Sequence, residues 1–313
     1  MKIGQCVYNN QSYVVVVHES GVYRVGRDYL VDVQDLIIQA GKCPLGEYIN
    51  GLIETDIVHK VSDSEASLAQ KGYVLRRPVD MPEAWAVGVT YRRQALEHDR
   101  DLRNKKGKTE DLYQYAYENE RAEVFFKGFS RTIVGSGDEL WLRSDSSLVM
   151  PEAELVLMIG NDGLPVAYTL GNDLTAWDIE SECPLYLSQA KIWTGSGSIG
   201  PWLVPVEKAI NPYYFDLRCL VQREGEVALD VSGSTSGLKR SVEELCFYMN
   251  YSNLVAPGTV LYTGTTCVVD HDFDLKKGDS VEISTPLIGV LENTINVHDD
   301  VIKDFTIREG VNL

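Results

Sequence analysis

The feature that most constrains the fold is a long succession of short β segments in the second half of the chain. From Glu123 onward, apolar and β-branched runs alternate with Gly, Pro, Asn and Asp, and one clear helical pattern, SVEELCFYMNY at about 241–251, interrupts them. The runs are EVFFKGF, TIVGSGDELWLR, AELVLMIG, LPVAYTLGND, GPWLVPV, FDLRCLVQR, GEVALDV, TVLYTGTT and DSVEISTPLIGVLENTI. This density of strands predicts an α+β, β-rich fold and argues against the regular strand and helix alternation of a dinucleotide-binding fold.

The N-terminal part of the chain has a different pattern. An alternating stretch at 13–17 is followed by a turn at Ser20 and Gly21, a second short strand and the helix-like run VDVQDLIIQAG, which Gly41 closes. This pattern predicts a small N-terminal α/β domain over residues 1–78. Because 313 residues exceed a typical single domain, residues 79–313 are expected to form a larger domain, entered through the linker RRPVDMPEAWAVGVTY.

A charged insertion occupies about 92–121. It is rich in Arg, Lys, Glu, Asp and Tyr, and GKT at 107–109 divides it into two helix-like halves. Composition favours a pair of solvated helices. The alternative is a mobile lid over a site, since long polar insertions between strands often carry function.

The charge balance limits the possible partners. The chain has 29 Lys and Arg against 46 Asp and Glu, a formal net charge of −17. Such a surface repels phosphate backbones and anionic lipid, so neither nucleic acid nor a membrane is an expected partner, and an anionic small-molecule substrate would need a bound cation or a few focused basic side chains. No run reaches the roughly 18 to 20 apolar residues of a membrane span, and no signal peptide is recognisable, so we expect a cytoplasmic protein. The six cysteines lack a CxxC pair and are interpreted as reduced core thiols, with no zinc site.

The strongest constellation of polar residues is PEAELVLMIG followed by GNDLTAWDIE. Glu152 and Glu154 are two apart in a strand-like run, so their side chains project to the same face. Two unpaired carboxylates repel each other and are costly to bury, and a hard cation would remove both problems. Asp173, after Gly171 at an expected turn, would complete a Mg²⁺ site that could also accept Mn²⁺ or Ca²⁺. The alternative is that the two glutamates lie on an exposed strand face and are solvated.

Several other patterns are set aside. The GxGxxG at 195–200 is followed by Pro201 and a strand instead of a helix, and the aspartates at 270–274 lack the Gly and Glu of a calcium loop. No GxSxG motif accompanies the serines. The histidines lack metal-ligand spacing and are interpreted as surface or satisfied residues: His18, His59, His98, His271 and His298.

Successive blocks of the chain resemble the fumarylacetoacetate hydrolase superfamily in order and spacing. They are PEAELVLMIG, YTLGNDLTAWDIE, the lysine of PLYLSQAK, GPWLVP, and LVAPGTVLYTGTT followed by LKKGDSVEI, and the match covers roughly 86–291. The resemblance implies a large C-terminal domain of mixed β-sandwich or roll type, with Mg²⁺ held by Glu152, Glu154 and Asp173.

Within the superfamily, RAEVFFKG, GNDLTAWDIESECPLYLSQAK and STSGLKRSVEEL are most similar to the branch of 2-keto-3-deoxy-D-arabinonate dehydratases. This resemblance implies catalytic roles for Glu123 and Lys191 beside the metal, and substrate-binding or site-shaping roles for Lys127, Thr265 and Gln94.

Two positions depart from the superfamily's pattern. TYRRQALE has Gln94 and Glu97 where many hydrolases and decarboxylases have a His-and-Glu pair, and Gln94 cannot act as a general base. Trp177 replaces an arginine, so the ionic or hydrogen-bonding role of that arginine is expected to be absent.

The resemblance and the missing histidine together favour an enzyme that dehydrates a 2-keto-3-deoxy sugar acid, such as 2-dehydro-3-deoxy-D-arabinonate to 2,5-dioxopentanoate. The reaction would remove a C3 proton and expel the C4 hydroxyl. One alternative is a fumarylacetoacetate or acylpyruvate-type C–C hydrolase, or an oxaloacetate decarboxylase. A second, which Trp177 keeps open, is a non-catalytic ligand-binding member. In each case we expect a homodimer or a homotetramer.

Overall fold

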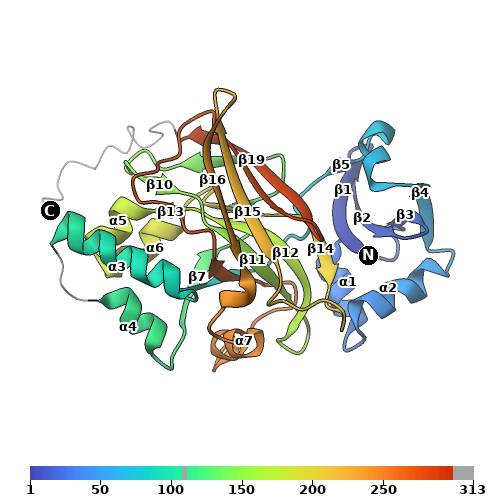
Figure 1. Cartoon of the computed structure of the whole chain (residues 1–313). Coiled ribbons are helices and arrows are strands. Elements are labelled where there is room, and N and C mark those ends of the chain that lie inside the picture. The colour runs from blue at the N-terminus through green and yellow to red at the C-terminus, as the bar shows by residue number, and fades with distance from the viewer. Residues whose placement is uncertain (108–110, 299–313) are drawn as a thin grey trace, which may run out of the picture.

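The computed structural model describes residues 1–107 and 111–298. Lys108 and Thr109 of the predicted helix break, and residues 299–313 of the predicted C-terminal domain, lie outside the described residues. Figure 1 shows β-strands in the middle of the molecule, the N-terminal strands with the helices that follow them at one end, and the helices of residues 92–118 and 177–191 at the other.

The larger sheet has twelve strands, ordered β4-β3-β2-β1-β14-β12-β11-β17-β6-β7, with β5 on β1 and β8 on β14. The strands before the linker are β1 Lys2–Tyr8, β2 Gln11–His18, β3 Gly21–Val25, β4 Val58–Ser62 and β5 Val74–Leu75. Those after it are β6 Ala84–Gly88, β7 Glu123–Gly128, β8 Ile133–Val134, β11 Ala153–Ile159, β12 Pro165–Asp173, β14 Gly197–Pro205 and β17 Val260–Thr265. Ile3 of β1 pairs with Leu203 of β14, so the N-terminal strands continue the sheet of the larger part.

The second sheet has five strands in the order β16-β15-β18-β19-β9. Their bounds are β9 Glu139–Leu142, β15 Asp216–Arg223, β16 Glu226–Ser234, β18 Ser280–Thr285 and β19 Gly289–Val297. A separate two-stranded sheet pairs β10 Val149–Met150 with β13 Thr175–Ala176, directly beside the acidic residues of interest.

The two large sheets share a hydrophobic core, and β11 shows how the sequence builds it. Leu155 and Leu157 of β11 pack in one cluster with Ile283 of the five-stranded sheet. Val156 and Met158, which alternate with them, pack in a second cluster with the helices after β3. A strand that is covered on both faces has a continuous apolar sequence, as β11 does. Each fully buried side chain of this size stabilises the fold by roughly 1.5–3 kcal/mol.

The helices between β3 and β4 cover one face of the larger sheet. They are α1 Val33–Ala40 and α2 Leu45–Ile53, and both contribute apolar residues to the second cluster. The Asp32 carboxylate accepts a hydrogen bond from the amide of Asp35 at 2.8 Å and so caps α1. Gly41 ends α1 with a φ of 61°, a conformation that glycine adopts without steric cost.

The remaining helices lie nearer the acidic residues. They are α3 Arg92–Lys106, α4 Leu112–Glu118, α5 Trp177–Glu182, α6 Leu187–Lys191 and α7 Val242–Asn250, with short 3₁₀ turns at Glu65–Ser67, Ala69–Lys71, Pro184–Tyr186 and Thr235–Gly237. The Ser241 hydroxyl accepts a hydrogen bond from the Glu244 amide at 3.1 Å and caps α7.

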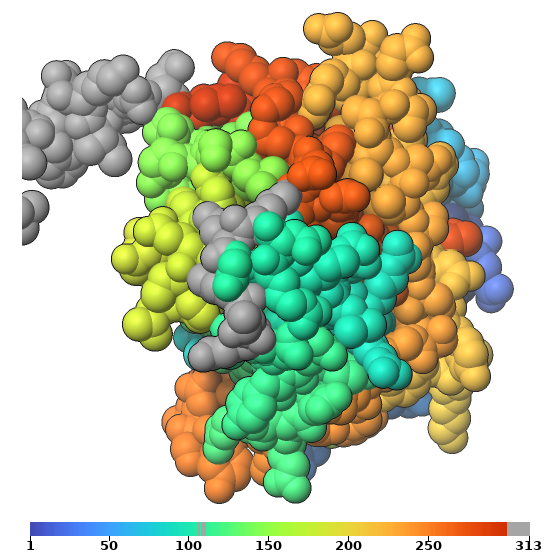
Figure 2. All heavy atoms as spheres, turned by 60° about the vertical axis from the view of Figure 1, so that its left-hand side comes forward, coloured from blue at the N-terminus to red at the C-terminus, as the bar shows by residue number. Residues whose placement is uncertain are grey.

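Helices α3 and α4 lie side by side on one face of the molecule (Figure 2). The Asp99 carboxylate of α3 accepts hydrogen bonds from the backbone amides of Tyr113, at 3.0 Å, and Gln114, at 2.8 Å, at the start of α4. Gln94, His98 and Asp99 are buried although α3 is strongly charged. The insertion is therefore packed onto the protein and is more than a pair of solvated helices.

The predicted β-rich α+β fold class is confirmed, as are the predicted strands and the division of the insertion into two helices. The turn expected at Gly171 and Asp173 is wrong, because both residues lie in β12. The helices over 177–191 and the helix at 45–53 were not anticipated, since they are short and weakly periodic. The domain boundary at residue 78 stays a prediction.

The structure also bears on the expectations for the cysteines and for membrane-spanning segments. Cys6, Cys219, Cys246 and Cys267 are buried thiols as expected, whereas the prediction of a core position is wrong for Cys43, which is exposed. Among residues 1–107 and 111–298, the helices are too short or too polar to cross a membrane.

Candidate active site

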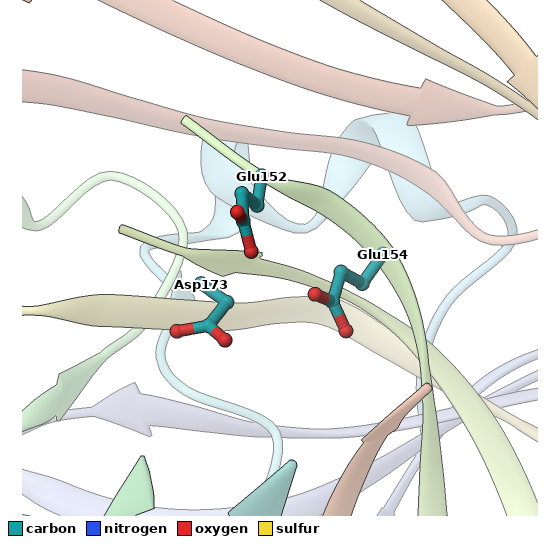
Figure 3. Close-up of side chains that lie close together, drawn as sticks. All are labelled: Glu152, Glu154 and Asp173. Carbon is teal, nitrogen blue, oxygen red and sulfur yellow. The ribbon is translucent and has the colours of Figure 1, made fainter. Parts of the chain in front are cut away.

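Three carboxylates converge at the edge of the two-stranded sheet (Figure 3). Glu152 directly precedes β11, Glu154 lies within β11, and Asp173 is the last residue of β12. One oxygen from each lies within 4.8 Å of the others, and the three side chains are almost fully buried. The pairing of β11 with β12 sets this arrangement, because the Asp173 amide donates to the Glu152 carbonyl at 3.0 Å.

Glu154 is held by the backbone of β17. The Gly264 amide donates a hydrogen bond to Oε2 of Glu154 at 2.7 Å. Gly264 has a φ of +92°, and a Cβ at this position would lie 2.0 Å from Oγ1 of Thr90. Only glycine permits this approach of β17 to the acidic cluster.

Lys191, at the end of α6, brings a positive charge to two of the carboxylates. Its Nζ lies 2.8 Å from Oε2 of Glu152 and 3.4 Å from Oδ2 of Asp173, and it donates to Oγ1 of Thr175 at 2.5 Å. Burial lowers the pKa of Lys191, but Asp173, Glu152 and Glu180 outweigh it, so the net pKa lies well above the ordinary value. The ammonium therefore stays charged.

Lys127, on β7, contacts the other side of Asp173. Its Nζ lies 2.5 Å from Oδ1 of Asp173 and donates to the carbonyl oxygens of Leu174 at 3.3 Å, Lys191 at 2.5 Å and Ser196 at 3.1 Å. Burial lowers the pKa of Lys127, and the attraction of Asp173 opposes this shift. The contact with Lys127 therefore helps to hold the Asp173 carboxylate in position.

The ionised form of Glu152 and of Glu154 is costly in free energy unless a further cation lies nearby. Burial raises the pKa of Glu154 well above its ordinary value, and the charges of Asp173 and Glu152 raise it further. Burial also raises the pKa of Glu152, and Lys191 offsets only part of this effect. Three buried carboxylates supply the hard oxygen ligands that Mg²⁺ prefers, and a divalent cation would relieve both the desolvation and the mutual repulsion. These residues therefore fit a magnesium site.

The carboxylates form one wall of a small cavity. About 20 Å³ of it is open to water-sized molecules, which is room for about one water molecule. The rest of its polar lining is formed by Gln94, His98, Tyr113, Glu123, Glu180 and Lys191. Admission of a substrate therefore requires side chains at this wall to move.

A larger pocket of about 340 Å³ adjoins the cavity between α4 and the α5–α6 region. The two share Val89, Tyr113, Glu123, Glu180 and Leu187 in their linings. The Tyr113 hydroxyl donates to Oε1 of Glu180 at 2.9 Å, so this pair lies where the pocket and the cavity meet.

The residues predicted to contact the substrate fall into two groups. Gln94, Glu123 and Lys191 line the cavity. Lys127 and Thr265 are absent from its lining, and the Thr265 hydroxyl donates to the carbonyl of Ala153 at 2.9 Å. The geometry favours supporting roles for these two residues, and their predicted contact with substrate is untested.

Trp177 has a role in the structure that differs from the expectation. Its Nε1 donates a hydrogen bond to Oδ2 of Asp101 on α3 at 2.8 Å, and its ring stacks on His98 with centroids 4.5 Å apart. Trp177 therefore makes a hydrogen bond of its own at this position, and the expected absence of the arginine's role stays a prediction. These contacts of Trp177 with Asp101 and His98 hold α3 against the cavity. Glu97 does not take part in them and forms an ion pair with Arg100 of the same helix.

The sequence interpretation missed three polar residues of the cavity. Glu180, whose pKa burial raises to about 7, ends the block GNDLTAWDIE but was not singled out, and Tyr113 carried no recognised motif. His98 was interpreted as a surface or satisfied residue. It is buried and hydrogen-bonded to His271, as a satisfied histidine is, but its place in the cavity lining was not predicted. Its spacing of four residues from Gln94 on a predicted helix was the available signal, because such residues share a face.

Comparisons with known proteins agree with the geometry. The family model described as "Fumarylacetoacetate (FAA) hydrolase C-terminal" matches residues 83–296. A probable 2-keto-3-deoxyxylonate dehydratase of Haloferax volcanii is 38% identical over 218 residues, which cover 70% of this chain and 73% of the relative. A 2-dehydro-3-deoxy-D-arabinonate dehydratase of Saccharolobus solfataricus is 36% identical over 218 residues, covering 69% of this chain and 72% of the relative.

A solved structure extends the likeness to nearly the whole chain. It is described as 2-keto-3-deoxy-D-arabinonate dehydratase complexed with magnesium and 2,5-dioxopentanoate. The two proteins are 29% identical in sequence and superimpose with a TM-score of 0.80, over 95% of this chain and 99% of the other.

Proposed function

The chain belongs to the fumarylacetoacetate hydrolase family, and from this premise we propose that it is a Mg²⁺-dependent dehydratase of a 2-keto-3-deoxy sugar acid. The two relatives above carry names of dehydratases of this substrate class, and the structural neighbour was solved with magnesium and a 2,5-dioxo acid. A five-carbon substrate with 2,5-dioxopentanoate as product is the proposed reaction.

One observation carries the proposal: a single cavity is lined by the carboxylate cluster, by the ammonium of Lys191 and by the carboxylate of Glu123. Magnesium held by Glu152, Glu154 and Asp173 would polarise the C2 carbonyl of a 2-keto acid and so acidify its C3 protons. Lys191, which stays charged, binds the anionic end of the substrate and stabilises negative charge that develops on the C2 oxygen.

Glu123 is the proposed base for the C3 proton. It is partly exposed to the cavity, and burial raises the pKa of its carboxyl group, which makes its anion a stronger base than an ordinary carboxylate. In the reaction the C3–H bond breaks and its proton moves to Glu123. The electron pair forms the C3=C4 double bond as the C4–O bond breaks, and the departing hydroxyl takes up the proton from Glu123 and leaves as water. Loss of a proton from C5 and protonation of C3, with tautomerisation of the C5 enol, then convert the resulting 5-hydroxy-2-oxopent-3-enoate into its isomer 2,5-dioxopentanoate.

A substrate screen tests the proposed function. The purified protein with Mg²⁺ is offered 2-keto-3-deoxy pentonates and hexonates, acylpyruvates and oxaloacetate, while substrate loss and the aldehyde product are followed. We expect turnover of a 2-keto-3-deoxy sugar acid with release of water. Cleavage of an acylpyruvate or decarboxylation of oxaloacetate as the main activity would assign the chain to a different reaction of the family, and Mg²⁺ binding without any turnover would favour a non-catalytic ligand-binding role.

We also propose that the protein works in the cytoplasm as a homodimer or homotetramer. Large apolar side chains stand exposed near α7 and α5, namely Phe247, Tyr251, Leu254 and Leu185, which supports an assembly surface. Light scattering coupled to size-exclusion chromatography measures the assembly, and a monomer at micromolar concentration would contradict it.

A further inference from the structure

Two histidines far apart in the sequence meet at the cavity. Nδ1 of His98, on α3, lies 2.8 Å from Nε2 of His271, a hydrogen-bonding distance. Both side chains are more than nine-tenths buried, with 6% and 4% of their surface exposed. Because Nδ1 of His98 is engaged in this bond, Nε2 is the nitrogen of that ring that remains for another partner.

The rings around His98 hold it in place. Trp177 stacks on it at 4.5 Å with planes inclined by 21°, and Tyr113 packs at 4.7 Å. The hydrogen bond with His271 uses Nδ1 of His98, and His98 lines the cavity. Nε2 is therefore the polar atom that His98 can offer to a molecule in the cavity.

Gln94 supplies a second polar atom beside His98. It lies one helical turn earlier on the same face of α3, it is 5% exposed, and its Oε1 has no partner among the described residues. Both residues belong to the cavity lining, together with the carboxylate cluster and Lys191. A 2-keto acid anchored by its carboxylate and C2 oxygen at the cluster has its remaining carbons free to reach α3.

Gln94 and His98 together form the part of the cavity lining that we call the α3 wall. Their polar atoms favour a substrate with hydroxyl groups over one with an apolar chain. An apolar chain against α3 would leave buried polar atoms without hydrogen bonds, which costs about 1–3 kcal/mol for each group. A hydroxylated chain would satisfy them. Burial, reinforced by His271, lowers the pKa of His98 well below its ordinary value, so the ring is neutral and can bond a hydroxyl group as donor or as acceptor.

We propose that His98, held in place by its hydrogen bond with His271, is a specificity-determining residue that hydrogen-bonds a hydroxyl group of the substrate beyond C3, with Gln94 beside it. The proposal rests on the proposed function and states which part of the substrate the α3 wall recognises. His98 contacts the substrate, and His271 is a positioning residue that acts through it.

The first experiment compares a hydroxylated and an apolar ligand in His98→Phe, which keeps a flat ring against Trp177. With Mg²⁺ present, kcat/KM for a 2-keto-3-deoxy pentonate is expected to fall about 10- to 100-fold, the loss typical of an unpaired site for a substrate hydroxyl. The dissociation constant of 2-oxopentanoate, which lacks the hydroxyl groups, is expected to stay the same or to fall, because phenylalanine removes a buried polar atom that an apolar chain leaves without a hydrogen bond. The exchange of its C3 protons in D₂O is expected to stay within about twofold, because C3 lies next to the anchored C2 carbonyl.

The second experiment examines His271 and the controls. His271→Leu is expected to reproduce the loss of selectivity, whereas His271→Gln, whose amide can reach Nδ1 of His98, recovers most of it. His98→Gln places an amide near the Nε2 position and is the second variant in case His98→Phe fails to fold, as judged by thermal unfolding. His59→Phe, a substitution of an exposed histidine, is expected to change nothing.

Two outcomes overturn the proposal: an unchanged preference for the hydroxylated ligand in the variant that folds, or an equal loss for hydroxylated and apolar ligands. Failure of the proposed function is separable. If the wild-type protein turns over no sugar acid, the preference is measured by binding alone, and the proposal then requires that the hydroxylated 2-keto acid binds more tightly than 2-oxopentanoate and that His98→Phe removes this difference.

Discussion

The ammonium nitrogen of Lys191 lies 2.8 Å from Oε2 of Glu152, inside the cluster of carboxylates that fits a metal ion. The cluster thus contains a buried cationic side chain that attracts the same anionic groups as Mg²⁺ would. Lys191 neutralises part of the buried charge, and its ammonium competes with a divalent ion for Glu152 and Asp173.

Lys191→Met is therefore expected to separate catalysis from metal binding. We expect kcat to fall at least ~100-fold, since an electrostatic group at the reacting end of the substrate is lost. Mg²⁺ affinity, measured by calorimetry, is expected to be maintained or increased, because a competing positive charge is removed. Lys208→Met, at an exposed lysine, is the matched control. A wild-type turnover rate in Lys191→Met would show that Lys191 has no catalytic role.

Removal of the metal, or of one of its ligands, is expected to abolish activity without unfolding the protein. Glu152→Gln and Asp173→Asn each remove one negative charge from a site held largely by charge. Activity after EDTA treatment and after readdition of Mg²⁺, with circular dichroism as a check of the fold, measures the effect. Glu226→Gln, at an exposed position on β16, controls for a general change of charge. Full activity in excess EDTA would contradict the metal assignment.

Glu123→Gln is expected to lower kcat more than Gln94→Ala does. Both residues line the cavity, but only a carboxylate can accept a proton from the substrate. We expect a loss of about 100-fold or more for Glu123→Gln, as is typical of a general base. Steady-state kinetics of the two variants provides the comparison, and the reverse order would place the base elsewhere, with Glu97 the next residue to examine.

Glu180 is expected to make the stability of the metal-free protein depend on pH. Burial raises the pKa of its carboxyl group from 4.5 to about 7, so the folded state holds this proton more tightly than the unfolded state. The resulting stability is fully present below pH 4.5 and is lost as the pH rises through 7, by an amount on the order of 2 kcal/mol between pH 5 and 8.

Glu180→Gln removes that dependence. The difference in Tm between Glu180→Gln and the wild type, measured in EDTA, is expected to shift in favour of the variant as the pH rises from 5 to 8. Glu182→Gln, at a neighbouring residue, is the matched control. A difference that is the same at all pH values would show that Glu180 does not titrate in this range.

Gly264→Ala is expected to weaken both the fold and the metal site. The added Cβ would meet Oγ1 of Thr90 at 2.0 Å and displace the amide that holds Glu154. Groups that orient a metal ligand typically contribute 10- to 100-fold in affinity, and we expect a Mg²⁺ dissociation constant raised by about that factor. Gly278→Ala is the matched control, because Gly278 has a similar φ of +90° and open space around the added Cβ. Equal effects of the two substitutions would show that backbone strain alone is responsible.

The sequence indicated the parts of the site that depend on local order. Side chains two apart in a strand share a face, so the spacing of Glu152 and Glu154 already placed two carboxylates together. The neighbouring acidic segment added Asp173, and the resemblance to known members supplied Lys191 and Glu123. The local pattern failed where the elements are short: the segment of Asp173 is a strand and not a turn, and α5 and α6 carry too few residues to show a helical period.

By itself, then, the sequence determined the strand-rich fold and the acidic half of the cavity, because both follow from the two-residue period of β-strands. The tertiary structure decided the other half. His98 and His271 are 173 residues apart, Glu154 and the Gly264 amide 110 apart, and Tyr113 and Glu180 67 apart. These pairs meet because α3, α4 and α5 pack over the ends of strands that are neighbours only in the folded sheet, and no periodicity within one element encodes a contact between elements so far apart.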